Sequence, residues 1–138
     1  MPRSTKYTLS AALSPGVVVY NSTGTTAAPC DSDTDASTTA ALRPLGALRS
    51  GGALGDEAVI AADGEIVQMT AGGAIADGDV LVCKDGTGGL VVPFTSVAAS
   101  LSDGDPIYTL GRAQAAAASG ASVPVLQNVQ LILASIPA

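Results

Sequence analysis

The feature of this sequence that most restricts its possible folds is an internal duplication. Residues 16–25 align with residues 78–87 at an offset of 62, and both segments consist of a glycine, an apolar strand and a polar turn that ends in Gly-Thr. Leu45-Gly46 aligns with Leu110-Gly111 at an offset of 65, a register that also aligns Gly55 with Gly120, Ala58 with Val123, Ile60 with Val125 and Ile66 with Leu131. The shared apolar positions and turn glycines predict two similar structural units, at about residues 16–70 and 78–134.

Both units are predicted to consist of short strands separated by turns. Four Asp-Gly pairs suit tight turns, because glycine adopts positive φ without steric cost and aspartate tolerates it. The expected strands, rich in branched apolar residues, are 58–60, 65–69, 80–82, 89–92, 107–110, 123–126 and 129–133. We therefore predict an all-β fold, a small barrel or sandwich with little helix. Residues 112–119, the one helical candidate, are expected to form a loop with at most one helical turn.

Two segments lie outside the predicted strands. Residues 1–15 are polar and are expected to form an extended arm on a single β domain of residues 16–138, whereas residues 21–41 are expected to form a long exposed loop. The first 30 residues carry Arg3 and Lys6 and no acid. Such an arm can add to the edge of a partner's sheet; a frayed terminus is the alternative.

The composition excludes several classes of function. The 138 residues contain no histidine, and 12 acidic residues outnumber 6 basic ones, for a net charge of −6. The missing histidine removes the commonest general base and metal ligand, and the acidic balance argues against a nucleic-acid partner. No apolar run approaches the ~18 residues that span a bilayer. We therefore expect no enzyme, no cofactor, and neither nucleic acid nor membrane as a partner.

One motif and the cysteines have plain explanations. Residues 31–35, Asp-Ser-Asp-Thr-Asp, have the spacing that opens a calcium-binding loop, but Ala36 and Leu42 stand where that loop needs glycine and glutamate. We interpret the segment as a solvated acidic loop. Cys30 and Cys83 are expected to be reduced thiols, with a mutual disulfide as the alternative.

The second half of the chain contains a fixed order of short segments, at 71–82, 85–87, 91–93, 110–113, 115–120 and 123–126, and residues 45–67 are a weaker version of the same order. This order resembles that of the capsid cement, or head decoration, proteins of tailed phages. Their order is a "G-x-x-I-x-x-GD-x-V" strand, an Asp-Gly turn, a "V-V-P" strand, a "G-x-A" step, an Ala-rich loop and an alternating last strand.

This resemblance implies a small β-rich domain, commonly trimeric, that clamps neighbouring major capsid subunits on the outside of an icosahedral head. It implies a structural virion protein on the outer capsid surface, made in the host cytoplasm, whose partners are the major capsid protein and copies of itself. The expected capsid contacts in the arm are Arg3, Lys6, Tyr7 and Leu9. The expected subunit interface comprises Leu48, Leu54, Ala115, Ala116, Ala117 and Ala118. The alternatives are another phage subunit, of a tail, fibre or head-surface knob, and a β-barrel module for ligand binding or adhesion.

Overall fold

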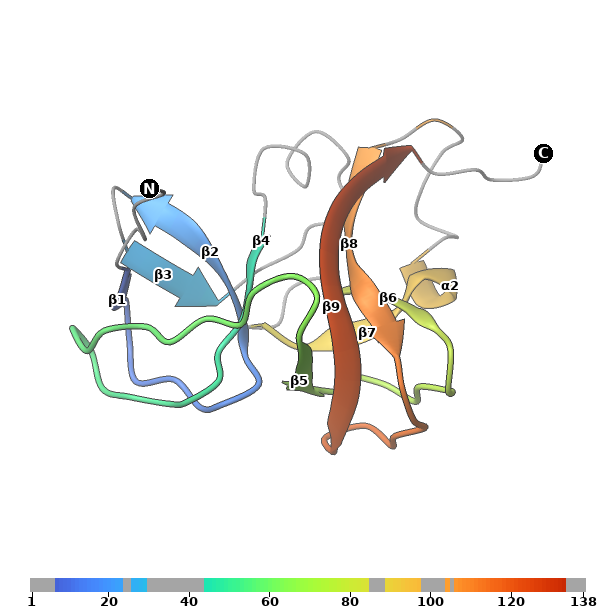
Figure 1. Ribbon diagram of the computed structural model, residues 1–138, viewed down its shortest axis with the longest axis horizontal. Helices are drawn as coiled ribbons and strands as arrows, with labels where there is room; N and C mark the ends of the chain where they lie inside the picture. The colour runs from blue at the N-terminus through green and yellow to red at the C-terminus, as the bar shows by residue number, and fades with distance from the viewer. Residues whose placement is uncertain are drawn as a thin grey trace.

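The computed structural model describes residues 7–23, 26–29, 44–84, 89–97, 104 and 106–133. Within these ranges the chain forms two β-sheets and one short helix, which confirms the predicted all-β class; the described strands form a sandwich-like arrangement and no closed barrel. Figure 1 shows the two sheets side by side. The elements are β1 (Thr8–Leu9), β2 (Val18–Thr23), β3 (Thr26–Pro29), β4 (Pro44–Ala47), β5 (Ile66–Thr70), β6 (Val80–Cys83), β7 (Val91–Pro93), α2 (Phe94–Val97), β8 (Pro106–Ala113) and β9 (Ser122–Leu133).

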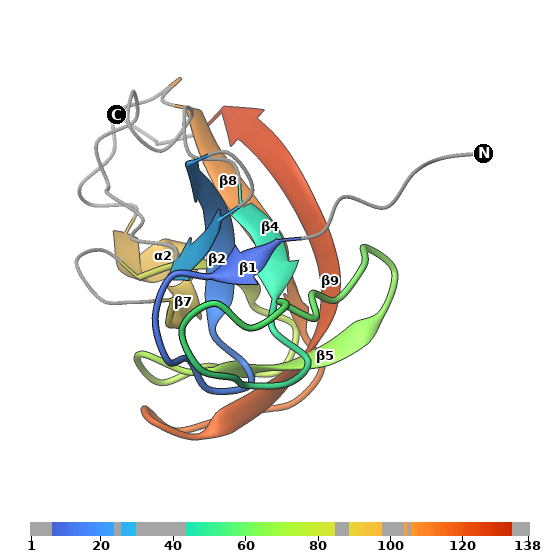
Figure 2. The same ribbon diagram turned by 90° about the vertical axis from the view of Figure 1, so that its left-hand side faces the viewer.

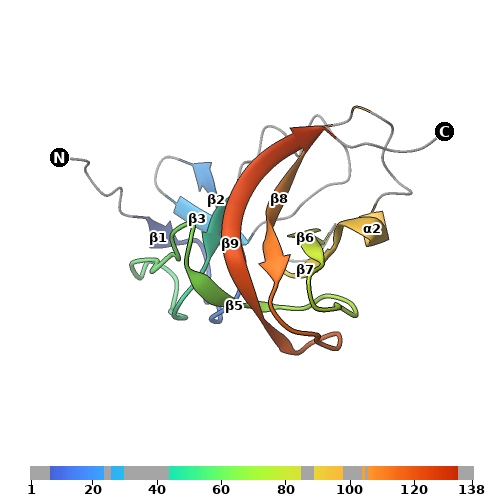
Figure 3. The ribbon, with the colours of Figure 1, turned by 45° about the vertical axis from the view of Figure 1, so that its right-hand side comes forward.

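The strand order separates the chain into an N-terminal and a C-terminal sheet. The first sheet has the order β1-β3-β2-β4 and faces the viewer in Figure 2. The second has the order β5-β9-β8-β6-β7, and its longest strand, β9, bends along β8 in Figure 3. Because β9 pairs with both β5 and β8, it joins the middle of the second sheet to its edge.

Several backbone hydrogen bonds recur in the two halves of the chain at the sequence offsets of 62 and 65. Gly16 N–H donates to the carbonyl of Leu48, and Gly78 N–H donates to that of Ala113 in the same way. Other bonds related by the same offsets are Leu13–Gly52 and Ile75–Ala117, Gly55–Leu9 and Gly120–Ala71, and Arg49–Val59 and Gln114–Pro124. The correspondence runs over residues 7–61 and 69–126, which we call repeat one and repeat two. It ends after Ala61 and Leu126, so the aligned pair Ile66 and Leu131 is not equivalent in space.

Two glycines within strands, Gly46 in β4 and Gly111 in β8, hold the two repeats in the same backbone path. Gly46 and Gly111 have φ values of 143° and 142°, a region that other residues rarely adopt. A Cβ atom on Gly46 would lie 2.8 Å from the carbonyl oxygen of Ala61, and one on Gly111 would collide with that of Leu126. These glycines therefore recur because a neighbouring strand passes too close for a side chain.

Several local predictions are wrong. Within residues 58–60, Ile60 alone forms a β-bridge, an isolated one with Leu48. The two strands expected over 123–133 are the single strand β9. The loop expected over 21–41 contains β3 and the end of β2, and Ala27 is fully buried. The loop expected over 112–119 is present from Gln114 onward, and only Arg112 and Ala113 differ from the prediction, because they belong to β8.

The described core consists of three packed clusters. The largest includes Met69, Leu81, Leu110, Val123 and Val125, all 0% exposed, and it lies mainly in repeat two. A smaller cluster around Leu9, Val19, Ala27 and Leu48 is the core of repeat one. The third joins α2 to the outer end of the second sheet through Val82, Val92, Val97 and Ile107.

Candidate interaction surface

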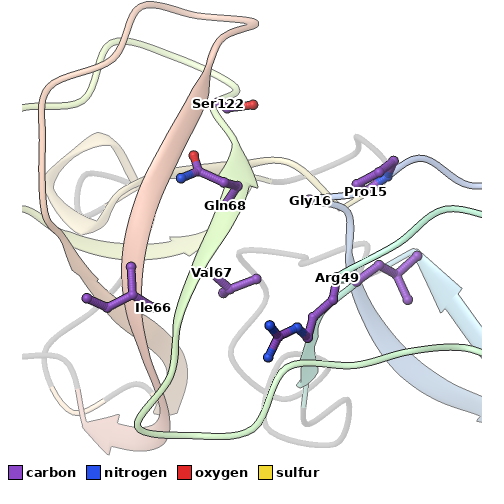
Figure 4. A pocket seen from close by; sticks show the side chains of 8 residues that line it. Pro15, Gly16, Arg49, Ile66, Val67, Gln68 and Ser122 are labelled. Atoms are coloured by element: carbon purple, nitrogen blue, oxygen red, sulfur yellow. The ribbon is translucent and has the colours of Figure 1, made fainter.

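The edge strand β5 lies beside an open cleft between the two repeats. β5 stands at the end of the second sheet, and among the described strands it pairs with β9 alone, while on its other edge Thr70 N–H donates to the Gly16 carbonyl. On its other side lies a cleft of about 390 Å³, lined by Pro15, Gly16, Leu48, Arg49, Ile66, Val67, Gln68 and Ser122. In Figure 4, Val67 points into the cleft and Arg49 reaches toward β5 from the opposite wall.

The register of β5 decides which backbone groups point into this cleft. Gln68 pairs with Pro124, which has no N–H to donate, so this pair cannot exchange both ladder bonds. Antiparallel pairs alternate between bonded and non-bonded positions, so the N–H and C=O groups of Ile66 and Gln68 point away from β9. The bond from Thr70 N–H to the Gly16 carbonyl, 3.2 Å long, agrees with this direction two residues beyond Gln68. The cleft therefore lies beside backbone groups that can pair with an extended segment.

The walls of the cleft combine apolar surface with one ion pair. Ile66 is 63% exposed on β5, whereas Val67 and Leu48 form a buried floor. Arg49 forms an exposed ion pair with Glu65, the residue that precedes β5. The hydrogen bond from the Ala62 N–H, followed by the positive charge of Arg49, holds the pKa of Glu65 below its ordinary value. The cleft therefore presents the exposed side chain of Ile66 beside the polar and charged groups of Gln68, Ser122 and Arg49, a mixture that protein-binding surfaces also contain.

The structure corrects two of the residues expected in interfaces. Leu9 is 2% exposed and Leu48 is 1% exposed, and both belong to the packed core of repeat one. Leu9 is held there because its N–H donates to the carbonyl of Asp56 and β1 pairs with β3. Thr8 and Leu9 are therefore part of the first sheet and not of an extended arm, and neither leucine offers its side chain to a partner.

The other predicted residues lie at several separate places. Tyr7 is half-buried against the core of repeat one, and Leu54 is 71% exposed at the tip of a loop. In the loop between β8 and β9, Ala116 and Ala118 are exposed, whereas Ala115 and Ala117 are half-buried and Ala117 packs against the main core. Only loop tips therefore retain the accessibility that an interface needs.

Some predictions fall outside the described residues, namely those for Arg3, Lys6, Cys30 and the acidic segment 31–35. Among the residues that the structure does describe, no group of three or more histidine, cysteine, aspartate or glutamate side chains is arranged to hold a metal ion. In the same part of the chain, no helix is long and apolar enough to cross a membrane. Cys83 lies in the main core and is 3% exposed.

Sequence reasoning missed the residues that shape this surface. Ile66 and Gln68 occur in a correctly predicted strand, but nothing local shows that this strand is an edge. The signal that was available is Pro124, since a proline in a strand restricts which partner edge can be bonded. No protein-family model matches the chain, and no curated protein matches it either.

Proposed function

We propose that this protein is a decoration protein of a tailed-phage head, which binds the outer surface of the capsid and stabilises the lattice of major capsid subunits. The observation that carries the proposal is the outward-pointing backbone of β5 beside the cleft. In this proposal an extended segment of a capsid subunit adds to β5 as a further strand. The protein then acts by binding alone, without catalysis or a cofactor.

One further feature supports the proposal. The sequence from Ala71 to Leu126, which resembles head decoration proteins, coincides with repeat two almost from end to end. Binding only to the assembled shell would stabilise that shell by mass action, and many copies on one lattice would add avidity. A short added strand at each site is sufficient in such an arrangement, because the copies act together.

The test is co-pelleting of the protein with expanded heads that lack it. The wild-type protein should bind saturably, at a fixed ratio to capsid subunits. The Gln68→Pro variant removes the N–H that points into the cleft and places a ring there, while no ladder bond to β9 is lost. We expect its apparent affinity for heads to fall at least about tenfold. Each bound copy loses roughly one hydrogen bond between uncharged backbone groups, and the losses of the many copies on the lattice combine.

The matched control is Gln68→Thr, which changes the same side chain but keeps the backbone N–H and suits a strand. It should bind heads within about twofold of wild type, since an exposed substitution of this kind changes little. A deletion of residues 2–6 tests the predicted contacts of Arg3 and Lys6 without removing Leu9 from the core. Absence of wild-type binding to heads would overturn the function, and equal binding by Gln68→Pro would overturn the role of β5.

A further inference from the structure

The edge strand β5 begins with an exposed apolar side chain, which extends a row across one face of the second sheet. Ile66 lies directly opposite Leu126 of β9. Residues opposed in an antiparallel sheet point to the same face, which we call the outer face. Ile66 is 63% exposed and Leu126 is 41% exposed. Charged residues or proline usually protect a sheet edge, so an uncovered isoleucine here favours a partner whose apolar side chain packs beside it.

The backbone of Ile66 is turned toward the cleft. Gln127 N–H of β9 donates to the carbonyl of Glu65 at 2.9 Å, so the Glu65 carbonyl points to β9. Successive carbonyls of a strand point to opposite sides, so the carbonyl of Ile66 points to the cleft. The N–H of Gln68 points the same way. These two groups can bond an added strand.

The paired stretch must be short, because the chain itself occupies the next part of the edge. Thr70 N–H donates to the Gly16 carbonyl, and a Cβ atom on Gly16 would lie 3.3 Å from the carbonyl oxygen of Gln68. An added segment can therefore pair beside Ile66 and reach the N–H of Gln68. It has to end or turn away where Gly16 begins.

The inner side of the cleft has little room for side chains. Side chains of a strand alternate between its two faces, and in Figure 4 Ile66 and Val67 point to opposite sides of β5. The residue beside Ile66 therefore points outward, and its two neighbours point toward Val67 and Leu48. These are 8% and 1% exposed and already pack in the core. The cleft of about 390 Å³ must also hold the backbone of the segment, so the inward side chains have to be small.

The ion pair at the cleft determines which charge the segment can carry. Arg49 is bonded to one carboxylate oxygen of Glu65, and the other oxygen accepts the N–H of Ala62 at 2.7 Å. An acidic residue in the segment would face Glu65, and a basic residue would face Arg49. Neither gains a net attraction from a pair that is already formed. The geometry therefore favours an uncharged segment.

We propose that β5 selects an uncharged segment with the pattern small, apolar, small. A branched apolar residue such as valine lies beside Ile66 and extends the row formed with Leu126. Alanine, glycine or serine on either side of it faces the inner side of the cleft. This inference rests on the proposed role of β5 as a strand acceptor and specifies the chemistry of the capsid segment that it binds.

The test is a titration of the isotope-labelled full-length protein with blocked peptides, followed by NMR at the amide signals of Ile66 and Gln68. The peptide Ser-Ala-Val-Ala-Ser should bind saturably with a Kd of about 1 mM, as suits so short a strand. The peptide Ser-Leu-Val-Leu-Ser keeps the valine but enlarges both inward side chains. It should bind at least about tenfold more weakly, because the cleft cannot accommodate them.

The variant Ile66→Glu tests the outward position. Because Ile66 is exposed, the fold should be unaffected. Wild type should prefer Ser-Ala-Val-Ala-Ser to Ser-Ala-Lys-Ala-Ser, and Ile66→Glu should reverse this preference, by about two- to fivefold in each case. The matched control is Leu131→Glu, since Leu131 is 48% exposed on β9 but pairs with Tyr108, away from β5. It should keep the preference of wild type.

Three results would overturn the proposal. They are the absence of saturable shifts at Ile66 and Gln68 up to about 10 mM peptide, equal binding of the alanine and leucine peptides, and an unchanged preference in Ile66→Glu. Binding to heads is scored separately. Wild type that binds heads but none of the peptides would refute the pattern and leave the function standing, whereas selective peptide binding without head binding would refute the function alone.

Discussion

Replacing Gln127 by leucine should weaken the whole fold, because this one side chain joins the two repeats. Gln127 is 0% exposed, and it satisfies the N–H of Ala47 at 3.0 Å and the carbonyl of Ala61 at 2.8 Å. Both partners are buried, so water cannot replace the lost bonds. Each unsatisfied buried backbone group costs about 1–3 kcal/mol, which gives a loss of about 2–6 kcal/mol for the pair.

Leucine keeps most of the volume of glutamine, so the contribution of a cavity to this loss is small. A domain of this size has a free energy of unfolding of about 5–15 kcal/mol, of which the loss is a large part. The assay is equilibrium unfolding in urea followed by far-ultraviolet circular dichroism. The control is Gln130→Leu on the exposed face of the same strand, which should change stability by less than about 0.5 kcal/mol. A loss below about 1 kcal/mol for Gln127→Leu, or equal losses in both variants, would refute the role of Gln127.

Two further predictions concern a glycine and a carboxylate. Gly111→Ala should cost more than about 2 kcal/mol, because its Cβ would collide with the Leu126 carbonyl at a φ of 142°. Gly120→Ala, at a φ of 88° with open space around it, should cost only about 1 kcal/mol; equal losses in thermal unfolding would contradict the argument from close approach. Glu65 has a pKa lowered from 4.5 by the Ala62 N–H, so its stabilising contribution is present above pH 4.5 and is lost as the pH falls through the lowered pKa. The difference in urea midpoint between wild type and Glu65→Gln should therefore narrow below pH 4.5, and a difference that stays constant would contradict this prediction.

The duplication was predictable from the sequence because backbone geometry, not side-chain identity, is what the repeats share. Gly46 and Gly111 recur because the backbone of Ala61 and of Leu126, respectively, lies too close for a side chain. Such glycines can be recognised in the sequence because they occupy the same position in each copy. The strands around Val67 and Leu81 were predictable for a related reason. Each is a short apolar run with a turn residue at its end.

The elements that the sequence analysis missed depend on pairing between distant segments. Thr26–Pro29 has little intrinsic preference for a strand, yet it forms β3 because β1 and β2 lie on either side of it. The sequence predicts Leu9 in an arm because the clear alignment between the two copies begins at Gly16. Its equivalent, Ala71, lies in repeat two at the same offset of 62 and is 0% exposed. Extending the alignment backward would have indicated that Leu9 is buried.

Gln127 could not be identified from the sequence for a physical reason. Its two backbone partners lie 80 and 66 residues away, and a polar residue within an alternating strand predicts an exposed position. It is buried because repeat one closes over the side of β9 on which it lies. The cleft beside β5 has the same origin, since one wall comes from repeat one and the other from Ser122 of repeat two and the segment that joins the repeats. The site therefore depends on how the repeats dock, which local pattern does not encode.

The docking of unlike halves also explains why the two copies have diverged. Repeat two encloses the larger core, with Met69, Leu110 and Val125 fully buried, so its inner positions require large apolar residues. Repeat one covers that core with Ala47 and Ala61, whose small side chains allow β4 to approach β9. In repeat two the same positions hold Arg112 and Leu126, which suit an outer face. Each repeat thus keeps the common backbone and carries the side chains that its place in the assembly demands. A substitution at equivalent positions should therefore have unequal effects.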